Sequence, residues 1–249
     1  MVGDPVHWLA DRVAVVTGAS RGIGAATAVA IGAAGAHVFL AARGSAALDG
    51  IADHIRRADG TATPVPADVS KPKDVERLFA AAEGAGRLAA LVCAAGVLRP
   101  APFAETTSQT WEHTLAVNLT GSFLCCRAAF NAMRHAGVGR IVNIASLSGI
   151  YATEKFPGLA AYNVSKYGVI GLTEAIAVEG KRHGISAICV SPGAVDTQML
   201  RQANPELRPG LTPADVAALI VALLDSPLAP ASGANIPLFS NAEPGEADG

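Results

Sequence analysis

The fold is decided by the stretch VAVVTGASRGIG, from Val13 to Gly24, in which an apolar run leads through a glycine-rich loop into a helical pattern. Glycine permits a sharp turn and lets a bulky phosphate approach main-chain atoms. The N-terminus of the next helix adds unpaired N–H groups and the positive end of the helix dipole. The spacing G-x-x-x-G-x-G is not the commonest dinucleotide fingerprint, and a glycine turn used only for tight packing would look the same. Its position at the first strand–helix turn favours nucleotide binding.

Short apolar runs alternate with longer helical patterns along the rest of the chain. Such alternation predicts parallel strands joined by crossover helices. Several runs, such as Leu91–Ala94, are apolar throughout, as expected when helices cover both faces of a sheet. We therefore predict the α/β class, with a single doubly wound Rossmann-type domain whose seven-stranded parallel sheet is flanked by helices on both faces.

The expected elements can be placed on the sequence. Strands are expected at Val13–Thr17, His37–Ala42, Ala62–Pro66, Ala89–Ala95, Arg140–Ala145, Ile185–Ser191 and Asn235–Phe239. Helices are expected at Ile23–Ala34, Ala46–Ala58, Lys71–Ala82, Thr110–Ala136, Ala160–His183 and Pro213–Leu224. The last helix has a clear start, because Thr212 can serve as its N-cap. We expect the domain to span residues 11–240, between an N-terminal extension at 1–10 and a flexible tail at 241–249.

The composition excludes several classes of protein. Of the 249 residues, 51% are hydrophobic and 16% are charged, which suits a chain with a substantial core and argues against disorder. The formal net charge is −2, and no clustered basic excess indicates nucleic-acid binding. The apolar run Ala89–Val97 is too short to span a bilayer, and the N-terminus has no secretory signal. We expect a cytoplasmic protein without a nucleic-acid or membrane partner.

The cysteines and histidines show no metal-binding pattern. Cys93, Cys125, Cys126 and Cys189 all lie in apolar segments, and no C-x-x-C pair is present. They are expected to be reduced core thiols, neither disulfides nor zinc ligands. The six histidines are scattered and show no H-x-x-x-H spacing, so no metal site is expected.

The end of the second expected strand bears on the choice of nucleotide. An acidic residue there would bond the adenosine ribose and favour NAD, but this strand ends in Ala42 and Arg43. A guanidinium makes bidentate bonds to phosphate, so Arg43 and Arg21 are candidates to bind a 2′-phosphate. The alternative is that both arginines are solvated surface charges. We expect NADP(H) to be favoured over NAD(H).

Two Y-x-x-x-K pairs are present, Tyr151–Lys155 and Tyr162–Lys166. On one face of a helix, the ammonium lowers the pKa of the phenol, which can then exchange a proton with a carbonyl or alcohol oxygen. A helix-breaking Phe-Pro-Gly at residues 156–158 follows the first pair, whereas the second opens a continuous helical pattern. The second pair is the candidate for chemistry. A structural tyrosine beside a surface lysine is the alternative.

Together these motifs resemble the short-chain dehydrogenase/reductase family, and in particular NADP(H)-dependent ketoreductases such as 3-oxoacyl-ACP reductases. The resemblance covers Asp11 to Ser240 and rests on Thr17–Gly24, Asp68-Val69, Asn118, Ser146, Tyr162–Lys166 and Ser191-Pro192-Gly193. It implies hydride transfer between a nicotinamide and a ketone or secondary alcohol, with Tyr162 as general acid/base. Lys166 would lower the pKa of Tyr162 and bond the nicotinamide ribose. Ser146 would polarise the substrate oxygen, and Asn118 would support a water-linked proton relay.

The same resemblance implies the cofactor contacts. The residues expected to bind the cofactor are Thr17, Gly18, Ser20, Arg21, Gly22, Ile23, Gly24, Arg43, Asp68, Val69, Ala95, Gly96, Asn118, Tyr162, Lys166, Pro192, Gly193, Val195 and Thr197. Asp68 and Val69 would contact adenine, and Thr197 would lie near the carboxamide. Ser148 competes with Ser146 for the catalytic role, and the glycine three residues after Ser146 favours Ser146.

The chain departs from the family's pattern in three places. Cys93–Gly96 reads Cys-Ala-Ala-Gly where the family often has Asn-Asn-Ala-Gly, which weakens polar support there. The separation between Ser146 and Tyr162 is longer than usual, and the insertion around Glu154–Leu159 is expected to lengthen a substrate-side loop. Only about 14 residues separate Thr197 from the next expected helix, which predicts a short substrate lid and an open site.

Two other functions remain as alternatives. A nicotinamide-binding sensor or scaffold without turnover would keep the glycine loop, and a cofactor-free lyase of the same fold would not need it. Halohydrin dehalogenases, which are such lyases, lack the dinucleotide glycines and have arginine in place of the motif lysine. The segments Ile150-Tyr151, Phe156 and Met199-Leu200 indicate an apolar small-molecule substrate, a carbonyl compound or alcohol. Members of the family commonly form tetramers through their two longest helices, so a homotetramer or homodimer is expected.

Overall fold

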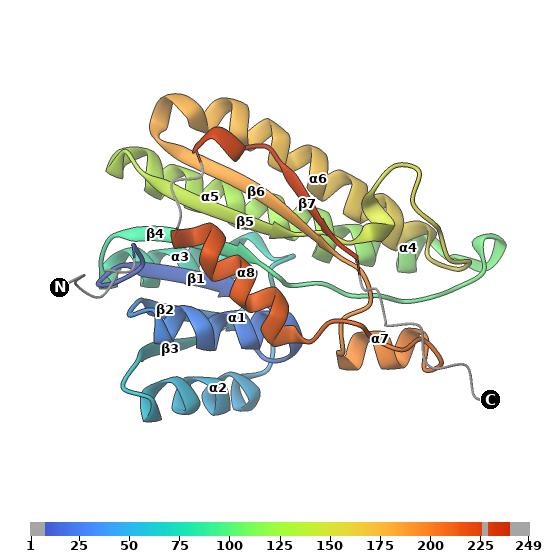
Figure 1. Ribbon diagram of the computed structural model, residues 1–249, viewed down its shortest axis with the longest axis horizontal. Coiled ribbons are helices and arrows are strands. Elements are labelled where there is room, and N and C mark those ends of the chain that lie inside the picture. Colours follow the sequence, from blue (N-terminus) through green and yellow to red (C-terminus); the bar gives the residue numbers. More distant parts are fainter. Residues whose placement is uncertain (1–7, 226–228, 240–249) are drawn as a thin grey trace, which may run out of the picture.

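The computed structural model describes residues 8–225 and 229–239 and confirms the predicted architecture. One parallel sheet has the strand order β3-β2-β1-β4-β5-β6-β7 (Figure 1). Strands β1 and β4 are buried over their whole length, as the uniformly apolar runs predicted, and β6 is buried at all but one residue. The strands are β1 (Val13–Thr17), β2 (His37–Ala42), β3 (Thr61–Pro66), β4 (Leu88–Cys93), β5 (Gly139–Ile144), β6 (Ile185–Pro192) and β7 (Asn235–Leu238).

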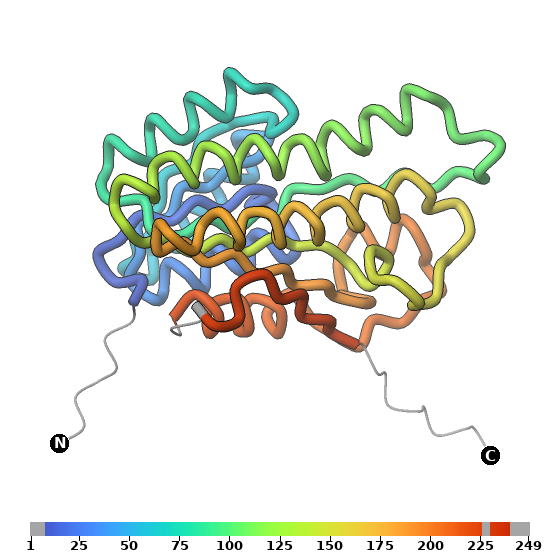
Figure 2. The backbone as a smooth tube through the Cα atoms, turned by 90° about the horizontal axis from the view of Figure 1, so that it is seen from above, coloured from blue at the N-terminus to red at the C-terminus, as the bar shows by residue number. Residues whose placement is uncertain are grey.

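Two layers of helices enclose the sheet. The helices are α1 (Gly22–Ala33), α2 (Ser45–Arg57), α3 (Pro72–Ala85), α4 (Ser108–Leu115), α5 (Gly121–Ala136), α6 (Ala160–Gly180), α7 (Gln198–Ala203) and α8 (Pro213–Asp225). Leu78 of α3 and Met133 of α5 lie in the apolar core on one face, with Ala177 of α6. Ile31 of α1 and Ile220 of α8 lie in the core on the other face. Figure 2 shows the path of the backbone through these layers from above.

The strand order determines where a ligand can bind. β1 pairs with β2, the next strand in sequence, and on its other side with β4. The connections after these two strands therefore leave the sheet in opposite directions, and a crevice opens at their carboxyl ends. The glycine loop follows β1 and residues 94–97 follow β4, so both line this crevice. The short helix α7 lies beyond the same ends of the strands (Figure 1).

Two helical expectations need correction. The expected helix Thr110–Ala136 is divided into α4 and α5 by a π-helical turn at Ala116–Thr120. The expected helix Ala160–His183 continues as α6 only to Gly180, and a 3₁₀ turn follows at Lys181–His183. Helix α7 and a 3₁₀ turn at Phe103–Glu105 are missed by the sequence analysis.

The predicted start of α8 is confirmed. The hydroxyl of Thr212 accepts a hydrogen bond from the main-chain N–H of Asp215 at 3.2 Å. In return the Asp215 carboxylate accepts one from the N–H of Thr212 at 2.8 Å. This reciprocal pair is a capping box, which satisfies donors at both ends of the first helical turn.

The described end of the expected N-terminal extension packs against the domain. The ring of Trp8 lies between the guanidinium groups of Arg12 and Arg140, which are 4.2 and 3.7 Å from its centroid. The main-chain N–H of Trp8 donates to the carboxylate of Asp225 at 2.8 Å. Residues 1–7 of the expected extension and the expected tail at 241–249 lie outside the described residues. No helix in the described ranges has the length and apolar character that crossing a membrane requires.

Candidate active site

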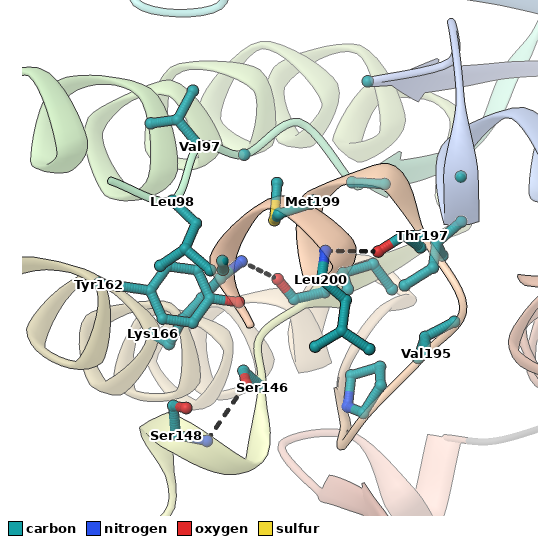
Figure 3. Close-up of a pocket in the computed structure, with 18 of the residues that line it drawn as sticks. Val97, Leu98, Ser146, Ser148, Tyr162, Lys166, Val195, Thr197, Met199 and Leu200 are labelled. Atoms are coloured by element: carbon teal, nitrogen blue, oxygen red, sulfur yellow. Dashed lines mark hydrogen bonds between the residues drawn. The ribbon is translucent and has the colours of Figure 1, made fainter. Parts of the chain in front are cut away.

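One cavity of about 1120 Å³ opens at the carboxyl ends of the strands. It extends from the glycine loop past the ends of β4, β5 and β6 to helix α7, and Figure 3 shows the part of it that lies around Tyr162 and α7. The structure brings almost all of the predicted site residues to its wall, and only Thr17 and Asn118 among them do not line it. Those at the wall are Gly18, Ser20, Arg21, Gly22, Ile23, Gly24, Arg43, Asp68, Val69, Ala95, Gly96, Ser146, Tyr162, Lys166, Pro192, Gly193, Val195 and Thr197.

The glycine loop has the geometry of an anion cradle. Gly18 has a φ of +68°, and a Cβ there would lie 2.7 Å from the main-chain oxygen of Ala94. Gly22 has a φ of +56°, so both positions favour glycine for conformational reasons. Arg21, the N-cap residue of α1, makes no side-chain capping bond. The first N–H groups of α1 therefore point toward the cavity without a side-chain acceptor, as phosphate binding at a helix N-terminus requires.

Replacing Gly24 with alanine is expected to destabilise the fold and abolish cofactor binding. The added Cβ would overlap the main-chain oxygen of Gly18, which cannot move without displacing the loop. We expect the free energy of unfolding to fall by about 3 kcal/mol or more. Urea denaturation measures this change, and Gly50→Ala is the matched control because a Cβ at Gly50 meets nothing within 4 Å. The control is expected to stabilise α2 by about 0.5–1 kcal/mol. Equal effects of the two variants would contradict the requirement for glycine at position 24.

Arg21 and Arg43 both line the end of the cavity next to β2. One Nη of Arg21 donates to the side-chain oxygen of Gln198 on α7 at 2.9 Å. This bond holds the arginine across the cavity and leaves its other N–H groups for an anion. Asp68, expected near adenine, accepts hydrogen bonds from both the N–H and the hydroxyl of Ser70 through one carboxylate oxygen.

Tyr162 and Lys166 lie on one face of α6, as the spacing predicted. The ammonium of Lys166 is 5.6 Å from the centroid of the Tyr162 ring and donates to the main-chain oxygen of Ile144 at 2.8 Å. Burial lowers the pKa of Lys166 to about 8, with a smaller opposing contribution from Cys189 and Cys93. Its neutral form is therefore accessible near physiological pH.

The expected lowering of the phenol pKa is wrong for the protein without cofactor. Burial raises the pKa of Tyr162, and hydrogen bonding to Ser146 only partly opposes this rise. The ammonium of Lys166 is held toward Ile144 and does not contact the phenol oxygen directly. Tyr162 is thus a protonated phenol, which is the form that can donate a proton to a carbonyl oxygen.

Ser146 follows β5 and is buried beside Tyr162 (Figure 3). Its hydroxyl accepts a hydrogen bond from the N–H of Ser148 at 3.2 Å, so the two serines lie on one tight turn. Ser148 also lines the cavity, but it is Ser146 that acts on the Tyr162 phenol, where it opposes the rise of the pKa. The other Y-x-x-x-K pair lies on a loop as predicted, with Tyr151 87% exposed.

Asn118 lies in the π-helical turn and is buried beneath the cavity. Its side-chain oxygen accepts from the N–H of Val97 at 2.8 Å, and its amide donates to the Val97 carbonyl and the Ser165 hydroxyl, each at 3.0 Å. The side chain therefore ties the segment after β4 to α6. Asn118 belongs to a π-helical turn, which is wider than a turn of a regular α-helix. The sequence pattern of a regular helix therefore does not indicate that its amide is directed into the protein.

A series of buried hydrogen bonds begins at Cys93, one of the two residues that replace the family's asparagines. The thiols of Cys93 and Cys126 are 3.9 Å apart, and Cys126 donates to the side-chain oxygen of Asn143 at 3.3 Å. Asn143 in turn donates to the Thr173 hydroxyl at 3.0 Å. Hydrogen bonding to neighbouring thiols and burial raise the pKa of Cys93 well above its usual range. All four cysteines are buried, and the hydrogen bonds from Cys93 to Thr173 connect β4, α5, β5 and α6.

The substrate side of the cavity contains residues that the sequence analysis did not single out. The loop after β4, the expected insertion and helix α7 all contribute to it. Tyr151 and Ile150, which the sequence suggested for this surface, do not line the cavity, whereas Phe156, Met199 and Leu200 do. The additional lining residues are Leu98, Pro100, Leu147, Leu159, Ala203 and Leu207. In the described part of the chain, no group of three or more histidine, cysteine or acidic residues can hold a metal ion.

Comparisons with known proteins identify the family of the chain. The family model for short chain dehydrogenases matches residues 12–208. A 3-oxoacyl-[acyl-carrier-protein] reductase from Synechocystis sp. is 37% identical over 200 residues, which are 80% of each chain. D-threitol dehydrogenase from Mycolicibacterium smegmatis is 36% identical, over 77% of this chain and 73% of that protein.

A solved structure from Beutenbergia cavernae, a candidate NAD(P)-dependent gluconate 5-dehydrogenase with bound NADP at low occupancy, superposes with a TM-score of 0.86. It is 32% identical in sequence, and the match covers 95% of this chain and 98% of that one. The matched family model spans both the glycine loop and the Tyr162–Lys166 pair. The chain therefore belongs to the short-chain dehydrogenase/reductase family.

Proposed function

We propose that this protein is an NADPH-dependent carbonyl reductase, acting in the reverse direction as a secondary alcohol dehydrogenase. The observation that carries the proposal is the single cavity in which the glycine cradle and the Tyr162 phenol face one another. Family membership supports oxidoreductase chemistry, and among the relatives are both a ketoacyl reductase and a polyol dehydrogenase. To that chemistry we add a preference for NADPH over NADH and the role of Tyr162 as proton donor.

The residues present fit a nicotinamide dinucleotide. The uncapped N-terminus of α1 suits the pyrophosphate, and the lack of a side chain at Gly96 leaves space between the end of β4 and Lys166. Asp68 and Val69 would hold the adenine, Lys166 the nicotinamide ribose, and Pro192, Gly193, Val195 and Thr197 the nicotinamide. When bound, the reduced cofactor supplies the hydride.

The chain's own residues supply orientation and the proton. Ser146 would donate a hydrogen bond to the carbonyl oxygen and so polarise it. Tyr162 would give its phenol proton to the same oxygen as negative charge develops there. Lys166 would act by holding the nicotinamide ribose beside Tyr162, because its ammonium donates to the main-chain oxygen of Ile144 and does not contact the phenol oxygen. Asn118 would act indirectly, by positioning the segment after β4 against α6.

The cofactor preference is tested by titrating the protein with NADPH and NADH and following the fluorescence of the reduced nicotinamide. We expect NADPH to bind more tightly, because both arginines line the adenosine end of the cavity and β2 ends without an acidic residue. The Arg21→Ala and Arg43→Ala variants should each lose about tenfold to a hundredfold in NADPH affinity. Their NADH affinity should stay within about twofold, since NADH lacks the 2′-phosphate.

Arg57→Ala is the control, because Arg57 is exposed on α2 and donates to the main-chain oxygen of Asp53. An NADH preference in the unaltered protein would show that the arginines do not select the cofactor. Failure to bind either nucleotide would contradict the oxidoreductase proposal and favour a lyase that works without cofactor.

We propose further that the protein forms a homotetramer or homodimer through α5 and α6. Phe123 on α5 and Val164 and Tyr167 on α6 are large and 39–45% exposed. Burying such side chains would remove apolar surface from water. Multi-angle light scattering is expected to give at least twice the chain mass of 25.1 kDa, and a monomer mass would refute this assembly.

A further inference from the structure

The half of the cavity beyond Tyr162 has an apolar wall. Figure 3 shows Leu98, Met199 and Leu200 around the Tyr162 phenol and the two serines. Leu98 comes from the segment after β4, whereas Met199 and Leu200 come from α7, so the wall closes on the reacting oxygen from two sides. Further aliphatic and aromatic side chains continue it outward, namely Leu147, Phe156, Leu159, Ala203 and Leu207.

Apart from Ser146 and Tyr162, the polar side chains that line this half in the described part of the chain are Ser148, Thr153, Glu154 and Asn204, and those of Thr153 and Asn204 already make hydrogen bonds within the protein. The Thr153 hydroxyl donates to main-chain oxygens of its own loop, 2.7 Å from that of Leu147 and 3.0 Å from that of Ile150. The side-chain oxygen of Asn204 accepts from the N–H of Glu206 at 3.3 Å. Ser146 and Tyr162 are directed at the reacting oxygen, so a substrate with a hydroxyl on every carbon would lose hydrogen bonds with water that this wall does not replace.

The charge of this half is negative. Among the charged side chains that line the cavity, Arg21, Arg43 and Asp68 lie in the cofactor half and Lys166 lies behind Tyr162. Among the described residues, Glu154 on the expected insertion is the charged residue that lines the substrate half. The neighbouring Lys155 does not line the cavity and directs its ammonium to the main-chain oxygen of Ile150 at 2.6 Å. A carboxylate-bearing substrate would therefore be repelled at the entrance.

We propose that the substrate of this site is an uncharged carbonyl compound with an apolar body. Leu98, Met199 and Leu200 would select the apolar body, and Glu154 would disfavour anionic compounds. The inference rests on the proposed carbonyl reduction and narrows its substrate class. Apolar contacts made next to the reacting carbon lower the activation free energy in proportion to the apolar surface they bury, so each buried methylene multiplies kcat/KM by a similar factor.

The test compares kcat/KM for three classes of carbonyl compound at saturating NADPH. The apolar class is the series 2-butanone, 2-hexanone and 2-octanone, the polyol class is erythrulose, and the anionic class is levulinate. We expect kcat/KM to rise about two- to fourfold for each added methylene, as partial to full burial of a methylene predicts. Erythrulose and levulinate are expected to be at least about tenfold poorer than 2-hexanone.

The outcomes separate the inference from the function on which it rests. A flat dependence on chain length, or a preference for erythrulose or levulinate, would overturn the apolar substrate while leaving carbonyl reduction intact. No reduction of any of the three classes, with NADPH bound, would overturn the proposed function and this inference with it.

Two variants assign the selection to named residues. Met199→Gln keeps the side-chain length but adds an amide, and it should lower kcat/KM for 2-octanone about fivefold or more while leaving that for erythrulose equal or higher. Met199→Leu keeps the wall apolar and is expected to preserve the dependence on chain length. Equal loss in both variants would show that packing of α7, and not polarity, is responsible.

The Glu154→Gln variant tests whether the negative charge of Glu154 disfavours anionic substrates. Removing an exposed carboxylate is expected to raise kcat/KM for levulinate about two- to fivefold, with a smaller change for 2-hexanone. Raised salt should reproduce part of this gain in the unaltered protein, because it screens the repulsion. An unchanged ratio of levulinate to 2-hexanone would overturn the role of Glu154.

Discussion

Replacement of Tyr162 by phenylalanine is expected to lower the rate of carbonyl reduction by about a hundredfold to ten-thousandfold, the range that loss of a positioned general acid produces. The phenol lies on α6 beside Ser146, and burial raises its pKa, so at neutral pH it holds the proton that the product alcohol needs. Phenylalanine fills the same space and removes only the hydroxyl. Pre-steady-state measurement of NADPH oxidation in the presence of 2-octanone gives the rate directly.

NADPH affinity provides the internal check on this variant, and it should change by no more than about twofold. Tyr167→Phe is the matched control, because Tyr167 lies on the same helix but its hydroxyl donates to the main-chain oxygen of Ile150, outside the cavity. The control is expected to keep most of its activity. Full activity in Tyr162→Phe would remove the phenol from the mechanism, and an equal loss in both variants would point to a structural cause.

Replacement of Lys166 by methionine is expected to lower kcat by about a hundredfold or more and to change the pH profile. Burial lowers the pKa of Lys166 to about 8, so the protein without cofactor loses the ammonium as the pH rises through that value. The kcat/KM for NADPH, which reports on the free enzyme, should therefore be highest below pH 8 and decline above it. Methionine has no titrating group, so the variant should show no decline near pH 8.

Lys155→Met supplies the comparison for this experiment. Lys155 belongs to the other Y-x-x-x-K pair, and its ammonium bonds the main-chain oxygen of Ile150 on an exposed loop. Its removal should leave the decline near pH 8 in place. A decline that persists in Lys166→Met would have to come from another group, and the assignment of the lowered pKa to function would be wrong.

The fold could be predicted because the signals that define it are local. Apolar runs such as Val13–Thr17 are long enough to indicate buried strands, and the glycine spacing that follows them needs no knowledge of distant contacts. The capping box of Thr212 and Asp215 is likewise contained within one turn. For the same reason the expected strand and helix positions agree with the structure to within a few residues in most elements.

Features that depend on tertiary contacts could not be predicted in this way. Helix α7 has six residues, too few to show a helical period, and its start is set by Thr197, whose hydroxyl accepts from the N–H of Leu200. The sequence around Asn118 has the same apolar pattern as a regular helix. The π-helical turn is therefore seen only in the structure, where the Asn118 side chain is hydrogen-bonded to Val97. The direction of the pKa shift at Tyr162 depends on burial by segments far apart in sequence.

The substrate half of the cavity was only partly foreseen for the same reason. Phe156, Met199 and Leu200 stand out in the sequence as an apolar set, and they line the cavity. Tyr151 belongs to the same sequence pattern, but it points outward and is 87% exposed. Leu98 joins the wall because the segment after β4 is held by hydrogen bonds between Val97 and Asn118.

Transfer of deuterium from NADPH deuterated at both C4 positions of the nicotinamide shows directly whether this protein moves a hydride to a carbonyl carbon. The protein is incubated with the labelled cofactor and 2-octanone, and the alcohol is analysed by mass spectrometry. With the unaltered protein we expect one deuterium on the carbinol carbon, and with Tyr162→Phe almost no labelled alcohol. Binding of NADPH without transfer of the label to any of the three classes of carbonyl compound would contradict it, and would leave a nucleotide-binding protein without this chemistry.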